Sequence, residues 1–400
     1  MKNIMMIAVE YPPCISGGVQ RTLKFSEHLP KFGWHPLVLA AGLRAYENID
    51  CSASFPDGVS VYRAFAFDSL QQLRVRGKYL GFTVMPDRYV TWLPAAVIKG
   101  IWLAKKYRPS VIYSTFPYST AHWVAMEVAR WTGIPWIADF RDPAHHHYME
   151  SNLVNPLSIF VDKKTVKRAD HFIFATERMR DCYLEAYPNL KDESVSVIEN
   201  GFNENLFNEL VGSPSKSNEE KFVILHSGVL HEDRDPLPLI VALGELIEKH
   251  GENSKYKNIC IHFRGAEPSV EERQAIEGYR LTDQVRFLPP ISFKESIREM
   301  LLADALLLLQ GALFNYQIPG KVYEYIAANK PILGLVDRDG ATAALLESVP
   351  GAEVVVSGAP SDIAKALELI LEFPEITRNV ADYSRFSKTK DLAHLLDGLI

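Results

Sequence analysis

The chain has 400 residues, of which 47% are hydrophobic and 23% charged, and its formal net charge is −6. This length favours two domains or one large α/β unit, and the balance of residue types excludes a disordered chain. The negative charge argues against nucleic acid as the main partner, because phosphate backbones are bound by basic surfaces.

The cysteines and the apolar runs predict a soluble cytoplasmic protein. No metal-binding spacing is present among the four cysteines, which we expect to be reduced: Cys14, Cys51, Cys182 and Cys260. No apolar run reaches the roughly 18 residues that a membrane helix needs. The first run, residues 3–9, ends at Glu10 and reads as a strand rather than a signal sequence.

Short apolar runs alternate with helical patterns along the chain, which is typical of parallel sheets with crossover helices. The first half contains seven such runs, at residues 3–9, 35–40, 59–65, 111–114, 134–138, 171–175 and 195–198. The second half contains six, at 222–227, 259–264, 285–288, 305–309, 332–336 and 353–356. The runs are almost continuously apolar, as in strands covered on both faces. The predicted fold class is α/β, with two Rossmann-like doubly wound domains.

Residues 212–220 are polar and lack periodicity, so they predict a linker. We place the N-terminal domain at residues 1–208 and the C-terminal domain at 209–381, followed by a helix at 382–400. Open α/β sheets bind ligands at the carboxyl ends of their strands. The loops at those ends are therefore the places to look for function.

The loop after the first strand contains Ser16, Gly17 and Gly18 ahead of a helical pattern. Ser16 suits the N-cap, and the two glycines let a ligand approach free N–H groups at the helix start. A plain strand-to-helix turn explains the loop equally well. The GxGxxG dinucleotide fingerprint is absent.

Two later residues of the first half are candidates for the chemistry. His122 follows the strand at 111–114 and either contacts a sugar or phosphate group of a bound ligand or is a partly buried histidine with satisfied hydrogen bonds. Asp142 follows the strand at 134–138 and either faces the ligand or pairs with Arg141.

The second half places a glycine and an arginine after its first strand. Gly228 permits close approach of the backbone, and the Arg234 guanidinium can fork onto diphosphate oxygens. The alternative is a surface arginine paired with Asp233 or Asp235.

The sharpest segment is residues 318–331, in which Pro319 and Gly320 open a short helix. Lys321 lies at its positive end, where a phosphate gains from both the ammonium and the dipole. Glu324, three residues on and therefore on the same face, can accept hydrogen bonds from ribose hydroxyls. The alternative is a surface ion pair between Lys321 and Glu324.

Four segments resemble glycosyltransferase family 4, which has the GT-B fold, and the resemblance covers essentially the whole chain. The segments are Tyr11-Pro12-Pro13 with Gly17, Gly18 and Arg21; residues 136–143; Asn200-Gly201-Phe202; and residues 319–325. The resemblance implies two domains that face a central cleft, with the C-terminal helix packed back on the first. It also implies a retaining transferase that uses a nucleotide-diphosphate sugar without a metal or another cofactor.

The resemblance implies that Arg234 and Lys321 bind the diphosphate, Glu324 binds the ribose, and Gly17 and Gly18 approach from the opposite domain. With the loops after residues 259–264 and 285–288 added for base recognition, the expected donor-binding residues are Gly17, Gly18, Gly228, Arg234, Gly265, Pro290, Gly320, Lys321, Val322 and Glu324. The residues expected to carry the chemistry are Arg234, Lys321, His122 and Asp142. The sequence leaves the base open between UDP and GDP.

One position departs from the family pattern. Many members have two glutamates around this helix, and Tyr316 stands where the first of them would be. That glutamate is expected near the transferred sugar. Gln310, Asn315 and Gln317 are alternative residues for binding sugar hydroxyls.

Metal binding is the minority interpretation of three acidic clusters, at residues 139–142, 233–235 and 337–339. Each has an arginine between its acids, which favours internal ion pairing. The run His145–His147 predicts a polar surface loop, because successive side chains point apart and no zinc spacing flanks them.

The acceptor remains open between a glycan, a lipid-linked molecule and a small molecule, with a place in cell-surface polysaccharide synthesis expected. Lys99, Lys105 and Lys106 lie beside Trp102 and predict either a face that touches anionic lipid or, with more weight, an ordinary core-packed helix. Two other functions stay open. One is a nucleotide-sugar epimerase, and the other is a non-catalytic scaffold with the GT-B fold.

Overall fold

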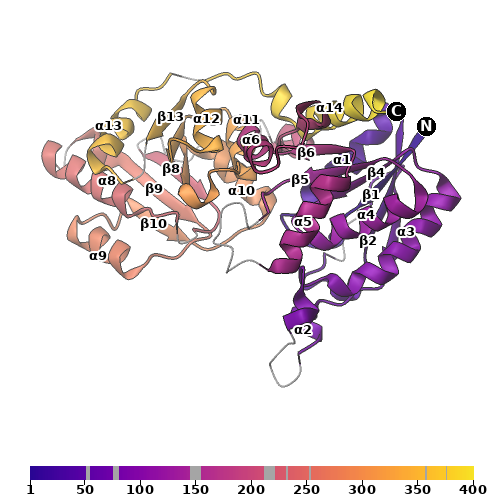
Figure 1. The fold of residues 1–400 in the computed structure, drawn as a ribbon. Helices are drawn as coiled ribbons and strands as arrows, with labels where there is room; N and C mark the ends of the chain where they lie inside the picture. Colours follow the sequence, from indigo (N-terminus) through magenta and orange to yellow (C-terminus); the bar gives the residue numbers. More distant parts are fainter. Residues whose placement is uncertain are drawn as a thin grey trace. The chain divides into compact units, whose positions relative to one another are not determined.

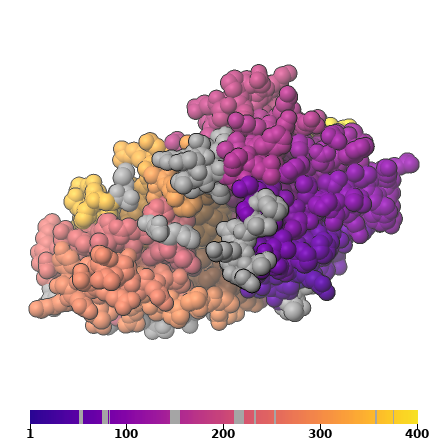
Figure 2. All heavy atoms as spheres, turned by 60° about the horizontal axis from the view of Figure 1, so that its bottom comes forward, coloured from indigo at the N-terminus to yellow at the C-terminus, as the bar shows by residue number. Residues whose placement is uncertain are grey.

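The computed structural model describes residues 1–50, 55–74, 81–144, 155–210, 221–230, 233–251, 254–355, 358–374 and 376–400. Cys51, the predicted linker at 212–220 and the run His145–His147 lie outside these residues. The chain divides into two compact units (Figures 1 and 2). Unit 1 consists of Met1–Asn200 with Arg385–Ile400, and unit 2 of Gly201–Ser384.

Unit 1 contains a seven-stranded parallel sheet in the order β3-β2-β1-β4-β5-β6-β7. Its strands are β1 Lys2–Ile7, β2 Trp34–Ala41, β3 Ser60–Ala64, β4 Val111–Thr115, β5 Trp136–Phe140, β6 His171–Phe174 and β7 Val195–Val197. Its α-helices are α1 Val19–His28, α2 Ser69–Gln72, α3 Leu93–Tyr107, α4 Ser119–Thr132, α5 Pro156–Arg168, α6 Glu177–Ala186 and α14 Arg385–Gly398. The direction of winding reverses between β1 and β4, which is the topological switch point of this sheet.

The central strand β1 is apolar throughout because both of its faces are covered. Met5 belongs to the core formed with Val124 of α4. On the other face, Ile4 belongs to the core formed with Phe25 of α1 and Leu392 of α14. Successive strand residues point to opposite faces, so a run of apolar residues without alternation is what this sandwich requires.

Unit 2 contains a six-stranded parallel sheet in the order β10-β9-β8-β11-β12-β13, with its switch point between β8 and β11. Its strands are β8 Phe222–Ser227, β9 Ile259–Arg264, β10 Val285–Leu288, β11 Ala305–Gln310, β12 Ile332–Val336 and β13 Ala352–Val355. Its α-helices are α7 Glu204–Leu210, α8 Leu237–His250, α9 Val270–Gly278, α10 Phe293–Leu302, α11 Gly320–Ala327, α12 Ala341–Glu347 and α13 Pro360–Ile370. No helix in the described ranges is long and apolar enough to cross a membrane.

All thirteen predicted strands are present, which confirms the two parallel α/β sheets. The division between the units falls after Asn200 rather than after residue 208. The reason is that Phe207 and Leu210 of α7 belong to the core of unit 2, which an apolar count along the chain does not reveal.

The last helix, α14, begins at Arg385 rather than at residue 382 and is part of unit 1. It packs against α1, where Phe386 meets the His28 ring with centroids 5.4 Å apart. Near its end, Asp397 forms an ion pair of 3.1 Å with Lys2. Figure 1 shows this yellow helix beside α1, with both chain ends close by.

Candidate functional site

The switch point of unit 2 gathers most of the residues that the sequence singles out. The loop after β8 carries Gly228 and Arg234, and the segment after the neighbouring strand β11 leads into α11 with Gly320 and Lys321. Chain connections leave this edge in opposite directions, so the two loops border a crevice in the sheet.

Helix α11 is held on the end of β8 by two side chains four residues apart, which therefore share one helix face. The buried Tyr325 hydroxyl accepts a hydrogen bond of 3.0 Å from the backbone N–H of Ser227. The Lys321 ammonium donates to the carbonyl oxygen of Ser227 at 3.1 Å and to Nε2 of His226 at 3.2 Å. Lys321 is therefore fixed at the first turn of α11, over the last residues of β8.

Neither ion pair that the sequence allowed is present here. Lys321 bonds to His226 and Ser227 rather than to Glu324. The Arg234 guanidinium lies over the Phe314 ring, 5.5 Å from its centroid, and reaches the carbonyl oxygen of Val229 at 3.5 Å. Within the described part of the chain, neither cation forms an ion pair with a carboxylate.

The pKa values of both cations are lowered, chiefly by burial. Burial and the positive charge of Arg234 together lower the pKa of Lys321 to about 7, against the attraction of Glu324. Burial also lowers the pKa of Arg234, against the attraction of Asp233. An arginine stays protonated in proteins, so this edge holds one fixed positive charge and one that titrates near neutrality.

The segments that follow strands β8, β9 and β10 bring glycine and proline residues together around Lys321. Gly228 has φ +121° and Gly265 has φ +81°, a backbone region that favours glycine. A Cβ atom on Gly228 would lie 3.4 Å from the Lys321 Nζ, and one on Gly265 would lie 3.9 Å from the Cβ of Pro290. The structure therefore brings together Gly228, Gly265, Pro290 and Lys321.

The remaining residues of the predicted helix segment have different surroundings. Gly320 opens α11, and a Cβ there would meet open space. Glu324 lies one turn below Lys321 and is 8% exposed. The Val322 side chain is fully buried in the core of unit 2, so it is a packing residue.

Of the three alternatives for the missing glutamate, Gln310 lines a cavity. Its Nε2 donates to the carbonyl oxygens of Phe314 at 2.8 Å and Gln317 at 3.1 Å. Its Oε1 has no hydrogen-bond partner in the described ranges. With Asp233 and Arg234 it borders a cavity of about 110 Å³ in unit 2.

The glycine loop of unit 1 differs from the expectation. Helix α1 is capped by Gly18 rather than Ser16, whose hydroxyl instead accepts from the Gly18 N–H at 2.9 Å and donates to the Glu10 carboxylate. A Cβ on Gly18 would lie 2.8 Å from that carboxylate, whereas Gly17 faces open space. A carboxylate repels an anion, so Gly18 is better explained by close packing than by phosphate binding.

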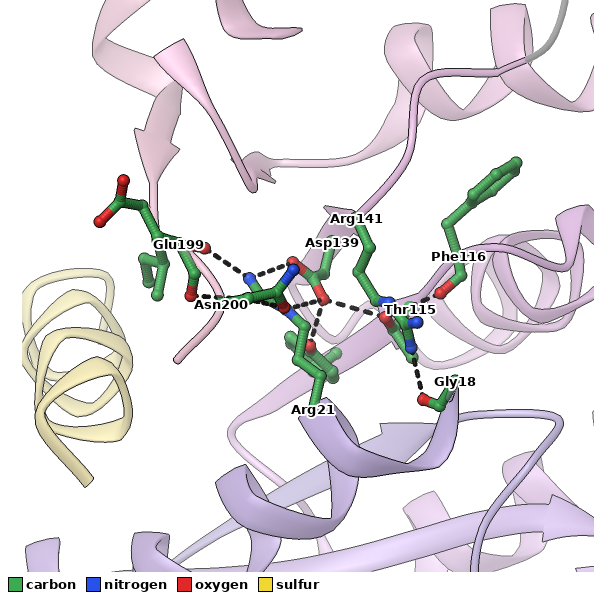
Figure 3. A network of polar contacts seen from close by, with 10 residues as sticks. Gly18, Arg21, Thr115, Phe116, Asp139, Arg141, Glu199 and Asn200 are labelled. Carbon is green, nitrogen blue, oxygen red and sulfur yellow. Dashed lines mark hydrogen bonds and ion pairs between the residues drawn. The ribbon is translucent and has the colours of Figure 1, made fainter. Parts of the chain in front are cut away.

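Arg21 and Asp139 form a buried ion pair at the switch point of unit 1 (Figure 3). Arg21 Nε and Nη2 donate to the two Asp139 oxygens at 2.9 and 2.8 Å, and the guanidinium also donates to the carbonyl oxygens of Ile198 and Glu199. Burial favours the neutral carboxyl, yet Arg21 holds the Asp139 pKa below its usual value.

The interpretation of internal ion pairing in residues 139–142 is therefore wrong for Asp139. Its partner lies 118 residues away, and Arg141 donates to the carbonyl oxygen of Gly18 instead (Figure 3). Asp142 follows β5 and is partly buried. Among the described residues, the clusters at 233–235 and 337–339 also contain no internal ion pair.

His122 is a core residue, only 1% exposed. Its Nδ1 shares a hydrogen bond of 2.7 Å with the Ser114 hydroxyl, and its ring packs beside Phe140 and Trp136. Burial lowers its pKa to about 4, so the ring is neutral at physiological pH. These contacts favour a core role for His122, but only Nδ1 is satisfied, because the buried Nε2 has no hydrogen-bond partner among the described residues.

Sequence reasoning missed His226, which is fully buried at the end of β8. The available signal was a single histidine in the otherwise apolar run 222–226, directly before a glycine turn. As for metals, the described residues contain no group of three histidine, cysteine or acidic side chains arranged to hold an ion.

Residues 16–201 match the family described as the glycosyl transferase 4-like domain. No curated protein sequence matches the chain significantly. Among solved structures, sucrose-phosphate synthase from Thermosynechococcus elongatus is similar over 100% of this chain and 99% of its own, with 15% identity and a TM-score of 0.66.

Two further structures are similar over nearly their whole length. The Anabaena protein HepE, solved in complex with UDP, has 15% identity, 100% coverage of both chains and a TM-score of 0.62. UDP-GlcNAc 2-epimerase from Methanocaldococcus jannaschii has 14% identity, 99% coverage of both chains and a TM-score of 0.55. These likenesses confirm the GT-B fold class.

Proposed function

Because residues 16–201 match the glycosyl transferase 4-like domain, and the whole chain has the GT-B fold, we propose that this protein transfers a sugar from a nucleotide-diphosphate sugar to an acceptor. The observation that carries the proposal is the pair of cations, Lys321 and Arg234, at the switch point of unit 2, neither of which is ion-paired to a carboxylate among the residues that the structure describes. Two such charges on a backbone crevice suit a diphosphate.

In the proposed reaction the bond between the anomeric carbon and the diphosphate oxygen breaks, and its electron pair stays on that oxygen. Lys321 and Arg234 stabilise the charge that develops there, the role that fixed cations serve best in catalysis. The acceptor hydroxyl oxygen forms the new bond on the same face of the sugar, and its proton passes to an oxygen of the departing diphosphate. Retention of configuration and independence from metal are parts of this proposal.

Other residues of unit 2 would bind the rest of the donor. Glu324 accepts hydrogen bonds from the ribose hydroxyls, one turn below Lys321. Gly228 and Gly265 present backbone to the phosphates, and the segment at Pro290 lies beside the base. Gln310, which borders the cavity next to Arg234, replaces the family's first glutamate in binding sugar hydroxyls.

The experiment that tests the donor is isothermal titration calorimetry with UDP, GDP, UDP-glucose and GDP-mannose. We expect binding of at least one of the four, and loss of that binding in Lys321→Ala and Glu324→Ala. Binding that is unchanged in both variants would sink the site assignment. A donor that binds but is never transferred to a glycan or lipid-linked acceptor would point to a scaffold.

An epimerase is the second candidate, because the epimerase from Methanocaldococcus jannaschii shares the fold. An epimerase needs no acceptor. Incubating the protein with UDP-GlcNAc alone and following the anomeric signals by NMR separates the two functions. Appearance of the 2-epimer supports the epimerase, and an unchanged donor argues for the transferase.

The acceptor side of the proposal includes a peripheral contact with anionic lipid during polysaccharide synthesis. Helix α3 buries Leu103 but leaves Ile98 72% and Trp102 48% exposed, and the Lys99 and Lys106 ammonium groups lie 5.7 and 4.8 Å from the Trp102 ring centroid. Flotation with phosphatidylglycerol vesicles tests this contact. We expect co-flotation that Ile98→Ser and Trp102→Ala reduce, and no association of the native protein would reject it.

A further inference from the structure

The buried His226 has a defined tautomer, which its hydrogen bonds determine. Its Nδ1 lies 3.1 Å from the carbonyl oxygen of Leu307, an atom that can only accept. Nδ1 therefore carries the proton, and Nε2 presents a lone pair. That lone pair lies 3.2 Å from the Lys321 Nζ.

The balance of the surrounding groups keeps the histidine neutral. Burial lowers the pKa of His226 well below its usual value, and the positive charges of Lys321 and Arg234 lower it further, whereas hydrogen bonds with the backbone of Leu307 and Gly228 raise it. The charged groups near Lys321 are Arg234 and Glu324, which act in opposite directions. In this tautomer the Nε2 atom can only accept a hydrogen bond, so it favours the protonated form of the lysine.

We propose that His226 is a positioning residue for donor binding, which holds the Lys321 ammonium through its Nε2 lone pair and aims the remaining N–H at the diphosphate. This inference rests on the proposed function and adds a residue to it. The ammonium has three donors, and two of them are used by His226 and by the Ser227 carbonyl. No described residue accepts from the third, which can reach a phosphate oxygen beside the Gly228 turn, where a Cβ would come within 3.4 Å of the Nζ.

A series of contacts crosses the switch point of unit 2. Leu307 lies in β11, His226 in β8 and Lys321 in α11, so the carbonyl of one central strand fixes the ring on the other, and the ring fixes the lysine. The ring also packs beside Phe263 of β9, with centroids 6.1 Å apart. Because these contacts fix the His226 ring, the Lys321 ammonium that it holds loses little conformational freedom when a ligand binds. Such preorganisation improves affinity.

The test compares two substitutions of His226. His226→Phe keeps a ring of similar size against Phe263 and removes the Nε2 acceptor, whereas His226→Gln keeps an acceptor at the same depth. Titration of UDP-glucose from pH 6 to 9 is expected to show about tenfold weaker binding by His226→Phe at pH 7.5, with the alkaline loss of affinity moved to lower pH. His226→Gln is expected to bind within about threefold of the native protein.

His262→Phe is the matched control, because His262 lies in the neighbouring strand β9 and points to the opposite face from Phe263. Its affinity and pH profile are expected to equal those of the native protein. Equal binding by native protein and His226→Phe would overturn the inference. So would equal weakening by His226→Phe and His226→Gln, because the variant that keeps an acceptor would then bind no better than the variant that lacks one.

A second measurement needs no ligand and therefore separates this inference from the proposed function. The pKa of Lys321 is read from the 13Cε signal that disappears in Lys321→Ala. His226→Phe is expected to lower that pKa, and an unchanged value would overturn the inference. If the native protein binds none of the nucleotide-diphosphate sugars, the proposed function fails, and the pKa comparison still decides the role of His226.

Discussion

Both units place cations at the carboxyl edge of a parallel sheet, but they satisfy them differently. In unit 1, Arg21 forks onto Asp139 and fills its other donors with backbone carbonyls of Ile198 and Glu199. In unit 2, Lys321 and Arg234 bond only to neutral groups of the described chain. A fully paired cation stabilises the fold, whereas a cation held by neutral acceptors keeps its charge for a ligand. This difference separates a structural arginine from the two residues that we propose bind the donor.

Removing the ion-paired cation of unit 1 should have the largest effect, and this effect should be a loss in the free energy of unfolding. Arg21→Met leaves the fully buried Asp139 without its cation, which costs about 3–5 kcal/mol for a buried pair. Chemical denaturation at pH 7 measures the loss. Arg130→Met, which removes an exposed i,i+3 partner of Glu127, is the control and should change stability by less than about 1 kcal/mol. If Arg21→Met lost as little stability as the control variant, the pair would not be structural.

The comparison also shows what a sequence can reveal. Apolar runs such as residues 222–227 predict strands well, because burial on both faces leaves no other pattern. The Lys321–Glu324 segment can be read as a site because helix geometry is local. The Arg21–Asp139 pair cannot be read in this way, because its members meet only through the order of strands in the sheet. Likewise, His226 was missed because its tautomer depends on Leu307, 81 residues away.

The second prediction concerns a cation of unit 2, whose removal should weaken binding rather than stability. Lys321→Met should weaken UDP-glucose binding by about 1.5–3 kcal/mol, the worth of a hydrogen bond to a charged group. The same variant should melt no earlier than the native protein, because burial disfavours the ammonium that it removes. Calorimetry and thermal denaturation measure the two effects. The control is Lys365→Met on the exposed face of α13, which should change neither. If the melting temperature of Lys321→Met fell as far as that of Arg21→Met, the proposed difference between the two units would be wrong.

A smaller effect is expected when the charge stays and only its geometry changes. Arg234→Lys keeps a cation beside Phe314 but loses the planar fork that matches diphosphate oxygens. We expect about tenfold weaker binding of UDP-glucose, near 1.4 kcal/mol, with unchanged stability. Arg273→Lys on the exposed side of α9 is the control. Full affinity in Arg234→Lys would show that Arg234 acts only as a point charge.

The smallest effect is the pH dependence of donor binding. Lys321 in the free protein has a pKa lowered to about 7, and a bound diphosphate would raise it, so the complex holds more protons than the free protein above that pH. Binding must therefore weaken as pH rises through 7, by about fivefold between pH 7 and 8 if the complex stays protonated. UDP-glucose is the right probe, because its diphosphate diester does not titrate in this range. Lys321→Met should remove this dependence of binding on pH. Arg21→Met should keep it, because the arginine that it removes is already ion-paired in the native protein. A flat profile in the native protein would place Lys321 away from the diphosphate.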